Sequence, residues 1–467
     1  MKKAARLLAI LLPFAAFGAE SRFQAGAAVV DITPPTGVRI NGGFWPSIAT
    51  EVHDPLLVRA LALDDGKTRL AFAVADNCLI TRDIFDEAKK LIRENTGLPA
   101  ACVMMSATHT HSAGAVADCY LTDAEPEYKK LLPAKLAAAV QQAFEKLQPA
   151  LIGWGRVEVP QHVFCRRWIF KPGTMPENPF GHRTDKVKMN PAVGSKDLVE
   201  PAGITDPEVS FLSIRTTAEQ PLAVLANYSL HYVGDVGPNH LSADYFGAFA
   251  IKLGEKLKAP AGFVAIMSNG TSADINNINF RGSDPRPWGN YQRINLVGDD
   301  VATAVAAALR KLHHRPWVEL RHSQRELFLG VRKPDEKEIA AAKELAQGRP
   351  SGLFKNLREV YARETLLLDK FPNTISQIVQ AFRIGDLAIG GISNEVFAET
   401  GLALKKSSPL KPFFTVSLAN GWTGYLPPRG QHDLGGYETW RSRTSYLEPD
   451  AESKIRAALL EVLHELK

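Results

Sequence analysis

Residues 57–77 read LVRALALDDGKTRLAFAVADN, which is two apolar runs on either side of Asp65-Gly66. An Asp-Gly pair between two such runs predicts a β-hairpin. Residues 82–95, RDIFDEAKKLIREN, carry apolar side chains at helical spacing, and residues 102–112, CVMMSATHTHS, form an apolar run that ends abruptly in polar residues. The three segments together predict strand, strand, helix and strand in that order.

The same order of elements occurs twice more along the chain. Alternation of strands with helices favours an α/β fold, here layered mixed β-sheets covered by helices. Ligands of such folds bind where strands end, so the polar residues that follow these strands are the candidates for a functional site. The second unit comprises residues 209–233, 245–257 and 262–276, and the third comprises residues 378–397, 398–407 and 413–428.

Two regions interrupt this scheme. Residues 171–206 are rich in Pro, Gly and charged residues and show no periodicity, so we interpret them as a loop over the site. Residues 333–370, with EKEIAAAKELAQ followed by NLREVYARETLLLDK, predict a helical insertion at the surface. No low-complexity linker separates independent domains, so we expect residues 20–467 to form a single domain.

The N-terminal residues predict export. Three basic residues precede a short apolar run at residues 7–17, and small residues follow, which is the pattern of a secretory signal peptide over residues 1–19. An uncleaved N-terminal anchor is the alternative interpretation. Because no other segment reaches 18 apolar residues, we expect the mature chain to have no integral membrane span and to be periplasmic or secreted.

The amino-acid composition and net charge indicate which kinds of partner the chain can bind. The chain has 467 residues, 45% of them hydrophobic and 22% charged, which is ordinary for a globular protein. Its net charge of +5 is small and evenly spread, and no stripe combines aromatic and basic residues. We therefore expect no nucleic-acid partner.

The four cysteines are Cys78, Cys102, Cys119 and Cys165, and their spacing matches no zinc motif such as CxxC. An exported chain can form disulfides. A bond between Cys119 and Cys165 and a set of buried free thiols therefore both remain open.

Polar side chains that follow separate strands have the chemistry of a metal site. Residues 108–112, THTHS, hold His109 and His111 directly after an apolar run, so that one of them can bind a metal while the other faces the neighbouring space. His231 follows the second hairpin, and Glu395 follows the apolar run LAIGGI, where an unpaired carboxylate is costly. Taken singly, each has an ordinary alternative, namely a polar loop histidine, a core histidine or a helix N-terminal acid.

Together these residues predict a catalytic zinc site. Such a site takes three protein ligands, usually nitrogens with a carboxylate, and keeps a position for water. Zinc polarises a carbonyl and lowers the pKa of water to about 7. Because the chain has no HExxH motif, it does not belong with the zinc proteases that carry their ligands on one helix.

At the level of these motifs the chain resembles the neutral/alkaline non-lysosomal ceramidases. The segments SATHTHS, YSLH, NEVF and NGWTGYLPP, with the later GGYE, occur in the order found in that family, and AGAAVVDITPP resembles its opening strand. The resemblance covers residues 24–467 and corresponds to the family's catalytic N-terminal domain. The family also carries a C-terminal β-sandwich domain, which we expect this chain to lack because it stops at Lys467 after a predicted helix.

The resemblance implies a role for each matching residue. Asn420 is kept from the family's Asn-x-Tyr-x-x-Tyr segment, whereas Trp422 replaces its first Tyr. Asp274, in GTSADIN, takes the position of a Ser that is important for activity in the family. This change favours attack by zinc-activated water, with Asp274 as its base or as the residue that orients His111. The implied zinc ligands are His109, His231 and Glu395, with Tyr425 as a further ligand or hydrogen-bond donor; His111 is the implied proton-transfer residue, and Arg166 and Tyr437 would stabilise the oxyanion.

The sequence therefore predicts a zinc-dependent hydrolase that cleaves an N-acyl amide bond, with Zn²⁺ as its cofactor. Ceramide or a related N-acyl lipid is the substrate that the resemblance implies. Two alternatives remain open. One is a zinc-dependent lactonase, esterase or phosphoester hydrolase, and the other is a non-catalytic, metal-bearing protein that binds a lipid or a glycan.

Overall fold

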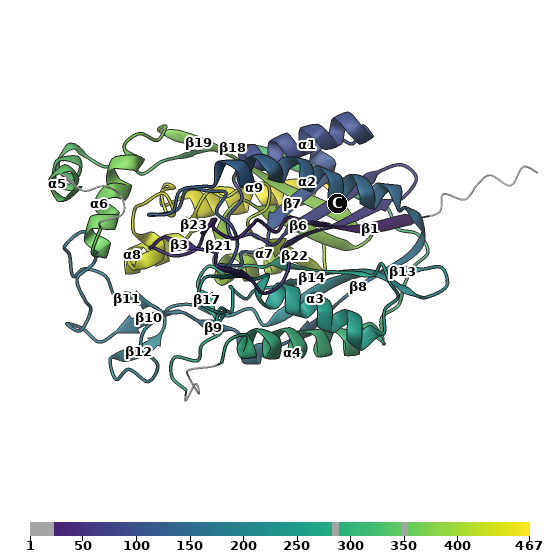
Figure 1. Ribbon diagram of the computed structural model, residues 1–467, viewed down its shortest axis with the longest axis horizontal. Helices are drawn as coiled ribbons and strands as arrows, with labels where there is room; N and C mark the ends of the chain where they lie inside the picture. The colour runs from purple at the N-terminus through teal and green to yellow at the C-terminus, as the bar shows by residue number, and fades with distance from the viewer. Residues whose placement is uncertain (1–22, 283–288, 347–353) are drawn as a thin grey trace, which may run out of the picture.

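The computed structural model of the chain describes residues 23–282, 289–346 and 354–467, so the predicted signal peptide lies outside the described residues. All three predicted units are present, each as an antiparallel hairpin followed by a helix and a strand parallel to the second hairpin strand. The predicted α/β fold of layered mixed sheets covered by helices is confirmed (Figure 1). The first unit is β5 (Leu57–Asp64), β6 (Arg69–Ala75), α1 (Arg82–Thr96) and β7 (Val103–Ala107); the second is β13 (Glu208–Thr216), β14 (Pro221–Tyr228), α3 (Asp244–Leu257) and β16 (Val264–Asn269); the third is β19 (Thr374–Ile384), β20 (Leu387–Ile392), α7 (Ala398–Ser407) and β22 (Phe413–Val416).

Turn chemistry closes the first hairpin as the sequence predicts. The Asp65 Oδ1 atom accepts hydrogen bonds from the backbone N–H groups of Lys67 and Thr68, at 2.8 and 2.7 Å. Gly66 has φ 87°, a conformation that glycine adopts without steric cost. The side chain of Asp65 therefore ties the turn down, and β5 pairs with β6 in full register.

One eight-stranded sheet joins the first two units. Its order is β16-β14-β13-β8-β1-β5-β6-β7, with β1 (Gln24–Asp31) and β8 (Gln148–Glu158) between the two units. Ala223 and Leu225 of β14 face the same core cluster as β5 and β6, whereas Val224, between them, packs with α3 and α4 (Gln292–Leu309). The sheet therefore curls until its two halves share one core, and each half keeps helices on its outer face.

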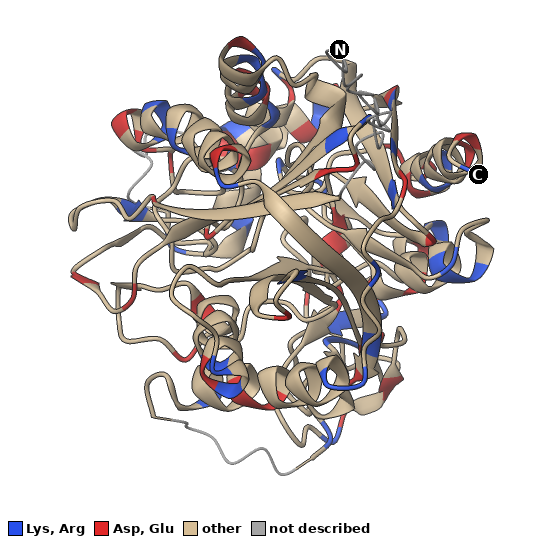
Figure 2. Ribbon diagram, turned by 90° about the vertical axis from the view of Figure 1, so that its right-hand side faces the viewer, with Lys and Arg blue, Asp and Glu red and all other residues tan. Residues whose placement is uncertain are grey.

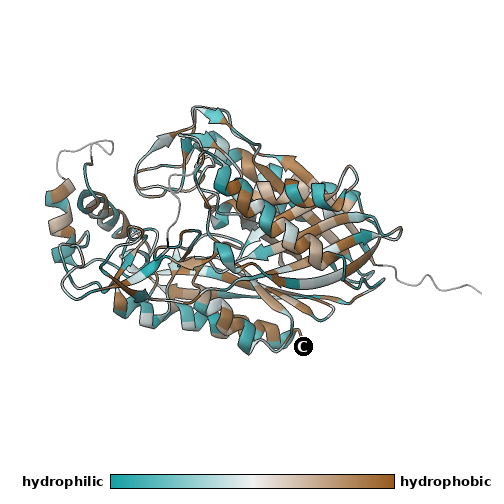
Figure 3. Ribbon diagram, turned by 90° about the horizontal axis from the view of Figure 1, so that it is seen from below, coloured by the Kyte–Doolittle hydropathy of each residue, from teal (hydrophilic) through white to brown (hydrophobic). Residues whose placement is uncertain are grey.

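The third unit forms a separate four-stranded sheet of order β18-β19-β20-β22, with β18 (Leu320–Gly330) at its edge. Phe382 and Ile389 face the central core, while Val379 and Ala388 pack beneath α9 (Ala451–Glu465). Helices thus cover the sheets from outside, and α2 (Pro126–Glu145) lies beside α1. Figure 2 shows many of the charged residues on these outer helices, and Figure 3 shows the apolar character of the strands between them.

The parallel pair within each unit places the site-bearing strand ends at one edge. β6 runs parallel to β7, β14 to β16 and β20 to β22, so both strands of each pair end on the same side. Short strands pair among the loops of the chain: β2 (Arg39–Ile40) with β3 (Ser47–Ile48), β4 (Glu51–Val52) with β15 (His240–Leu241), β9 (Phe164–Cys165) with β17 (Ile275–Asn276), and β21 (Glu395–Val396) with β23 (Tyr425–Leu426).

The segment 171–206, which the sequence presents as an irregular loop, is partly a small sheet. β10 (Arg167–Phe170) pairs antiparallel with β11 (Val187–Met189) on one side and β12 (Leu198–Pro201) on the other. Between these strands, Asp185 accepts a hydrogen bond from the indole of Trp440 at 2.7 Å. Strands of three or four residues leave no periodicity to read, which is why the sequence gives no sign of them.

The connection from β18 to β19 runs through two helices at one end of the molecule (Figure 1). They are α5 (Glu336–Ala346) and α6 (Leu357–Leu368). A further short helix, α8 (Arg429–Leu434), follows β23. Within the described residues, none of the helices is both long and apolar enough to cross a bilayer.

All four cysteines are buried free thiols, so the disulfide considered between Cys119 and Cys165 is not formed. Burial raises the pKa of the Cys165 thiol to about 12. The thiols are therefore protonated at neutral pH and serve as small apolar side chains.

Lys89 leads to a prediction for stability against pH. It lies buried on α1, and its Nζ donates to Asn420 Oδ1 at 2.7 Å. Burial lowers the pKa of Lys89 from 10.5 to about 8. Between these two pH values the unfolded chain binds more protons than the folded chain, so the unfolding free energy rises with pH.

We expect the unfolding free energy of the wild type to rise by about 3 kcal/mol more over this interval than that of Lys89→Met. Urea unfolding at a series of pH values measures both. Lys90→Met, at the exposed neighbouring position on the same helix, is the matched control and should keep the wild-type slope. Equal slopes for the two variants would contradict the prediction.

Candidate active site

Three buried side chains, one from each unit, converge at the common edge. His109 follows β7, His231 follows β14, and Glu395 follows β20; their exposed fractions are 2%, 2% and 5%. The Nε2 atoms of the two histidines lie 3.1 Å apart, and Glu395 Oε2 lies 3.3 Å from His109 Nε2. One ligand atom from each residue lies within 4.8 Å of the others, which is a suitable group for one metal ion.

Backbone carbonyls fix the tautomers of both histidines. His109 Nδ1 lies 2.9 Å from the carbonyl oxygen of Cys78, and His231 Nδ1 lies 2.9 Å from that of Ser272. A carbonyl only accepts, so each Nδ1 carries the hydrogen and each Nε2 keeps its lone pair. Two lone pairs that face each other at 3.1 Å repel unless a cation or a proton lies at their meeting point.

Glu395 completes a donor set that fits zinc. Trp422 Nε1 donates to Glu395 Oε1 at 3.4 Å, and Oε2 faces His109 Nε2 at 3.3 Å. Burial alone would raise the pKa of Glu395, but His109 and Arg166 outweigh it, so the pKa is lowered and the side chain is a carboxylate. Two imidazole nitrogens and a buried carboxylate oxygen are the ligands typical of a catalytic zinc site.

His111 lies beside His109 and is held by contacts of its own. Its Nε2 lies 3.3 Å from His109 Nε2, and its ring stacks on Tyr232 with centroids 3.7 Å apart. The backbone of Gly42 forms a hydrogen bond with it, and a Cβ at Gly42 would come within 2.5 Å of the ring. Burial, then His109 and Arg166, lower the pKa of His111 well below its usual value, so the ring is neutral.

Arg166 and Tyr425 place hydrogen-bond donors next to the histidines. Arg166 Nη1 lies 3.3 Å from His231 Nε2, and Nη2 donates to the Tyr425 hydroxyl at 3.2 Å. Tyr425 is paired with Glu395 in the register of β21 and β23. Burial and then Glu395 raise the pKa of Tyr425 well above its usual value, so its hydroxyl keeps its hydrogen and can donate.

Asp274 binds the start of α7, and among the described residues it forms no hydrogen bond with the two histidines. Its Oδ1 accepts from the backbone N–H of Ala398 at 2.9 Å, at the first residue of α7. Its Oδ2 has no hydrogen-bond donor among the described residues, and burial raises its pKa to about 7. Within the described part of the chain no hydrogen bond joins Asp274 to His111, whose orientation comes from Gly42 and Tyr232 instead.

The ring of Tyr437 packs against that of Tyr425. The two rings meet edge to face with centroids 5.5 Å apart. The Tyr437 hydroxyl accepts a hydrogen bond from the Tyr120 hydroxyl at 3.1 Å. Tyr437 is therefore connected to the candidate metal group through Tyr425. Its neighbour Tyr120 has no feature in the sequence that would select it as a site residue.

Two solved structures share this architecture. The crystal structure of neutral ceramidase from Pseudomonas aeruginosa matches with a TM-score of 0.73 at 17% identity, over 95% of this chain and 74% of that chain. This chain has the fold of a neutral ceramidase. A structure of ceramidase complexed with C2 also matches with a TM-score of 0.73, at 15% identity, over 95% of this chain and 75% of that one. No protein-family model and no curated protein matches the sequence.

Within this ceramidase fold, sequence reasoning missed the residue that holds Arg166. Glu438 is fully buried; its Oε1 accepts from Arg166 Nε at 2.9 Å and its Oε2 from Arg167 Nη1 at 2.5 Å. Burial alone would lower the pKa of Arg166, but Tyr425 and Glu438 raise it, so the guanidinium stays charged. The signal in the sequence was the arginine pair in FCRRW together with the acid that follows Tyr437.

Proposed function

We propose that the chain is an exported, zinc-dependent hydrolase of N-acyl amide bonds. The observation that carries this proposal is that the Nε2 atoms of His109 and His231 face each other at 3.1 Å, with Glu395 Oε2 lying 3.3 Å from His109 Nε2. The fold of the neutral ceramidases supports an amide substrate, because ceramide is an N-acyl amide. Export rests on the signal-peptide pattern of residues 1–19.

The chain's own residues supply the remaining chemistry. Zinc bound to His109, His231 and Glu395 would supply Lewis acidity toward the acyl carbonyl and a lowered pKa for water. Neutral His111 has its Nε2 3.3 Å from His109 Nε2, where it can take a proton from the attacking water and return it to the leaving amine. This proton return lets the amine leave as a neutral group.

In this proposal Arg166 and Tyr425 stabilise the oxyanion. Arg166 Nη1 lies 3.3 Å from His231 Nε2, and the Tyr425 hydroxyl accepts from Arg166 Nη2 and keeps its own hydrogen to donate. Both residues are held before substrate arrives, Arg166 by Glu438 and Tyr425 by its strand pairing. Preorganised donors in a buried site stabilise developing charge without reorganisation. Tyr437 adds a hydroxyl next to Tyr425.

A substrate panel with metal removal tests this proposal. Purified protein would be assayed on N-acyl amides of short and long acyl length, on a lactone and on a phosphate ester. We expect turnover of the amides, its loss after treatment with a chelator, and its return when zinc is added. Turnover confined to the lactone or the phosphate ester would replace the amide assignment, and one zinc per chain without turnover would favour a binding protein.

A further inference from the structure

Tyr120 lies at the centre of a group of buried hydroxyls. Its hydroxyl donates to Tyr437 at 3.1 Å and lies 2.8 Å from Thr444 Oγ1 and 3.4 Å from the Tyr361 hydroxyl. A tyrosine hydroxyl has one hydrogen to donate and two lone pairs to accept with. Because the hydrogen of Tyr120 goes to Tyr437, Thr444 and Tyr361 must both donate, and the capacity of Tyr120 is then fully used.

This arrangement gives the hydrogen bonds a direction. They run from Tyr361 and Thr444 to Tyr120, and from Tyr120 to Tyr437. Since the Tyr437 oxygen accepts from Tyr120, its own hydrogen is directed elsewhere. The ring of Tyr425 packs against Tyr437, as do those of Phe44 and Trp440. Linked hydrogen bonds polarise one another, so Tyr437 becomes a better donor at the end of this series.

The backbone around Tyr120 is held firmly. Its carbonyl oxygen accepts from Arg443 Nη2 at 2.9 Å and also from Arg363 Nη1. Its φ of 49° is uncommon for a residue other than glycine, so the surrounding contacts determine this conformation. The ring of Phe44 packs against it with centroids 4.5 Å apart. Tyr120 thus has the rigid support that a positioning residue needs.

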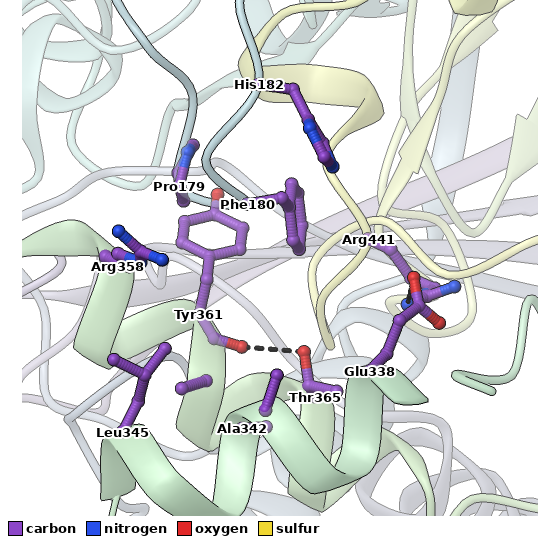
Figure 4. A pocket seen from close by; sticks show the side chains of 12 residues that line it. Pro179, Phe180, His182, Glu338, Ala342, Leu345, Arg358, Tyr361, Thr365 and Arg441 are labelled. Atoms are coloured by element: carbon purple, nitrogen blue, oxygen red, sulfur yellow. Dashed lines mark hydrogen bonds and ion pairs between the residues drawn. The ribbon is translucent and has the colours of Figure 1, made fainter. Parts of the chain in front are cut away.

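Tyr361 brings α6 into contact with this group. Its ring packs against Phe180 and Trp440, with centroids 5.6 Å from each, and lines a pocket of about 140 Å³ (Figure 4). The pocket lies between α5, α6 and the loop that carries Phe180, as the close view shows. One tyrosine of the helical insertion is therefore two hydrogen bonds away from Tyr437.

We propose that Tyr120 is a positioning residue for the reaction: it orients the hydroxyl of Tyr437, and Tyr361 of α6 holds Tyr120 in turn. The inference rests on the proposed amide hydrolysis for its kinetic consequence, but its structural part stands apart from that activity. Under this proposal the α5–α6 segment has the function of holding Tyr120 beside the site.

A double-mutant cycle between Tyr120→Phe and Tyr437→Phe tests the inference by kinetics. Tyr120→Phe should lower kcat about tenfold, the size of one hydrogen bond, with KM nearly unchanged. The double variant should be no slower than Tyr437→Phe alone, because Tyr120 acts only through Tyr437. Tyr361→Phe should give a smaller fall of the same kind. Full kcat in Tyr120→Phe, or a double variant in which the two losses multiply, would overturn the proposal.

The wild type, Tyr120→Phe, Tyr437→Phe and the double variant should also be unfolded in urea, which needs no substrate. The two substitutions should shift the midpoint by less together than the sum of their separate shifts, because they remove one shared hydrogen bond. Tyr228→Phe, which removes the buried hydrogen bond to the Val159 carbonyl, is the matched control and should be additive with Tyr437→Phe. Additive shifts for Tyr120 would overturn the inference, whereas coupling in a protein that hydrolyses no amide would retain the positioning and refute only the proposed function.

Discussion

Glu395→Gln should purify without stoichiometric zinc and should hydrolyse no N-acyl amide at a measurable rate. The substitution keeps the volume of the side chain but removes the negative charge that Oε2 presents to His109 at 3.3 Å. Loss of a residue that merely supports a metal ligand costs about 10–100-fold in affinity, so loss of a ligand should exceed about 100-fold. Plasma emission on purified protein, with a competition titration for affinity, measures both quantities.

Glu399→Gln is the matched control for this experiment, since Glu399 lies partly buried on α7 and takes no part in the candidate metal group. It should retain one zinc per chain and full activity. Zinc retained in Glu395→Gln at wild-type affinity would show that the ligand assignment is wrong. Zinc absent from the wild type as well, after reconstitution, would refute the site as a whole.

Glu438→Gln should have the largest effect on stability. It leaves the buried guanidinium groups of Arg166 and Arg167 without their shared carboxylate. Removing one partner of a buried ion pair costs about 3–5 kcal/mol, because the remaining charge is uncompensated. The free energy of unfolding, measured in urea, should fall by that amount, and hydrolysis should fall as well because Arg166 loses the acceptor that orients it.

Asp206→Asn provides a comparison for this variant. Asp206 accepts from Lys405 at 2.7 Å in a pair that is less completely buried and takes no part in the candidate metal group. It should cost less stability and leave kcat unchanged. Similar losses of stability from both substitutions would contradict the special position of Glu438.

Much of the fold is encoded locally and could be predicted. The Asp65-Gly66 turn and the helical spacing of residues 82–95 each depend on neighbours in sequence, and both are present as predicted. The polar residues after strands indicated where chemistry would gather, because strand direction alone brings such ends to one edge. The curling of the eight-stranded sheet depends instead on pairing across the whole chain, which no local pattern records.

The features of the site that escaped prediction are long-range or lie in the backbone. Asp274 contacts Ala398, 124 residues away, and Glu438 contacts Arg167, 271 residues away. Nothing near Asp274 in sequence indicates its contact with α7, and the acid that follows Tyr437 stands far in sequence from the arginine pair that it binds. The carbonyl acceptors of Cys78 and Ser272 have no sequence signature at all, because every residue has one.

Because main-chain carbonyls orient both histidines, the side chains at these two positions can change over generations. The orientation of both histidines is controlled at positions 78 and 272 by the main chain, so substitutions there leave the acceptors in place. Cys78 and Ser272 are buried, so the volume available to their side chains limits what can replace them. The Ser272 hydroxyl also donates to Asn269 Oδ1 at 2.7 Å, which adds a second limit at that position. Neutral drift can therefore alter position 78 among small residues, and position 272 among residues that keep a hydroxyl, while the imidazoles keep their alignment. Libraries of that composition should be rich in functional members.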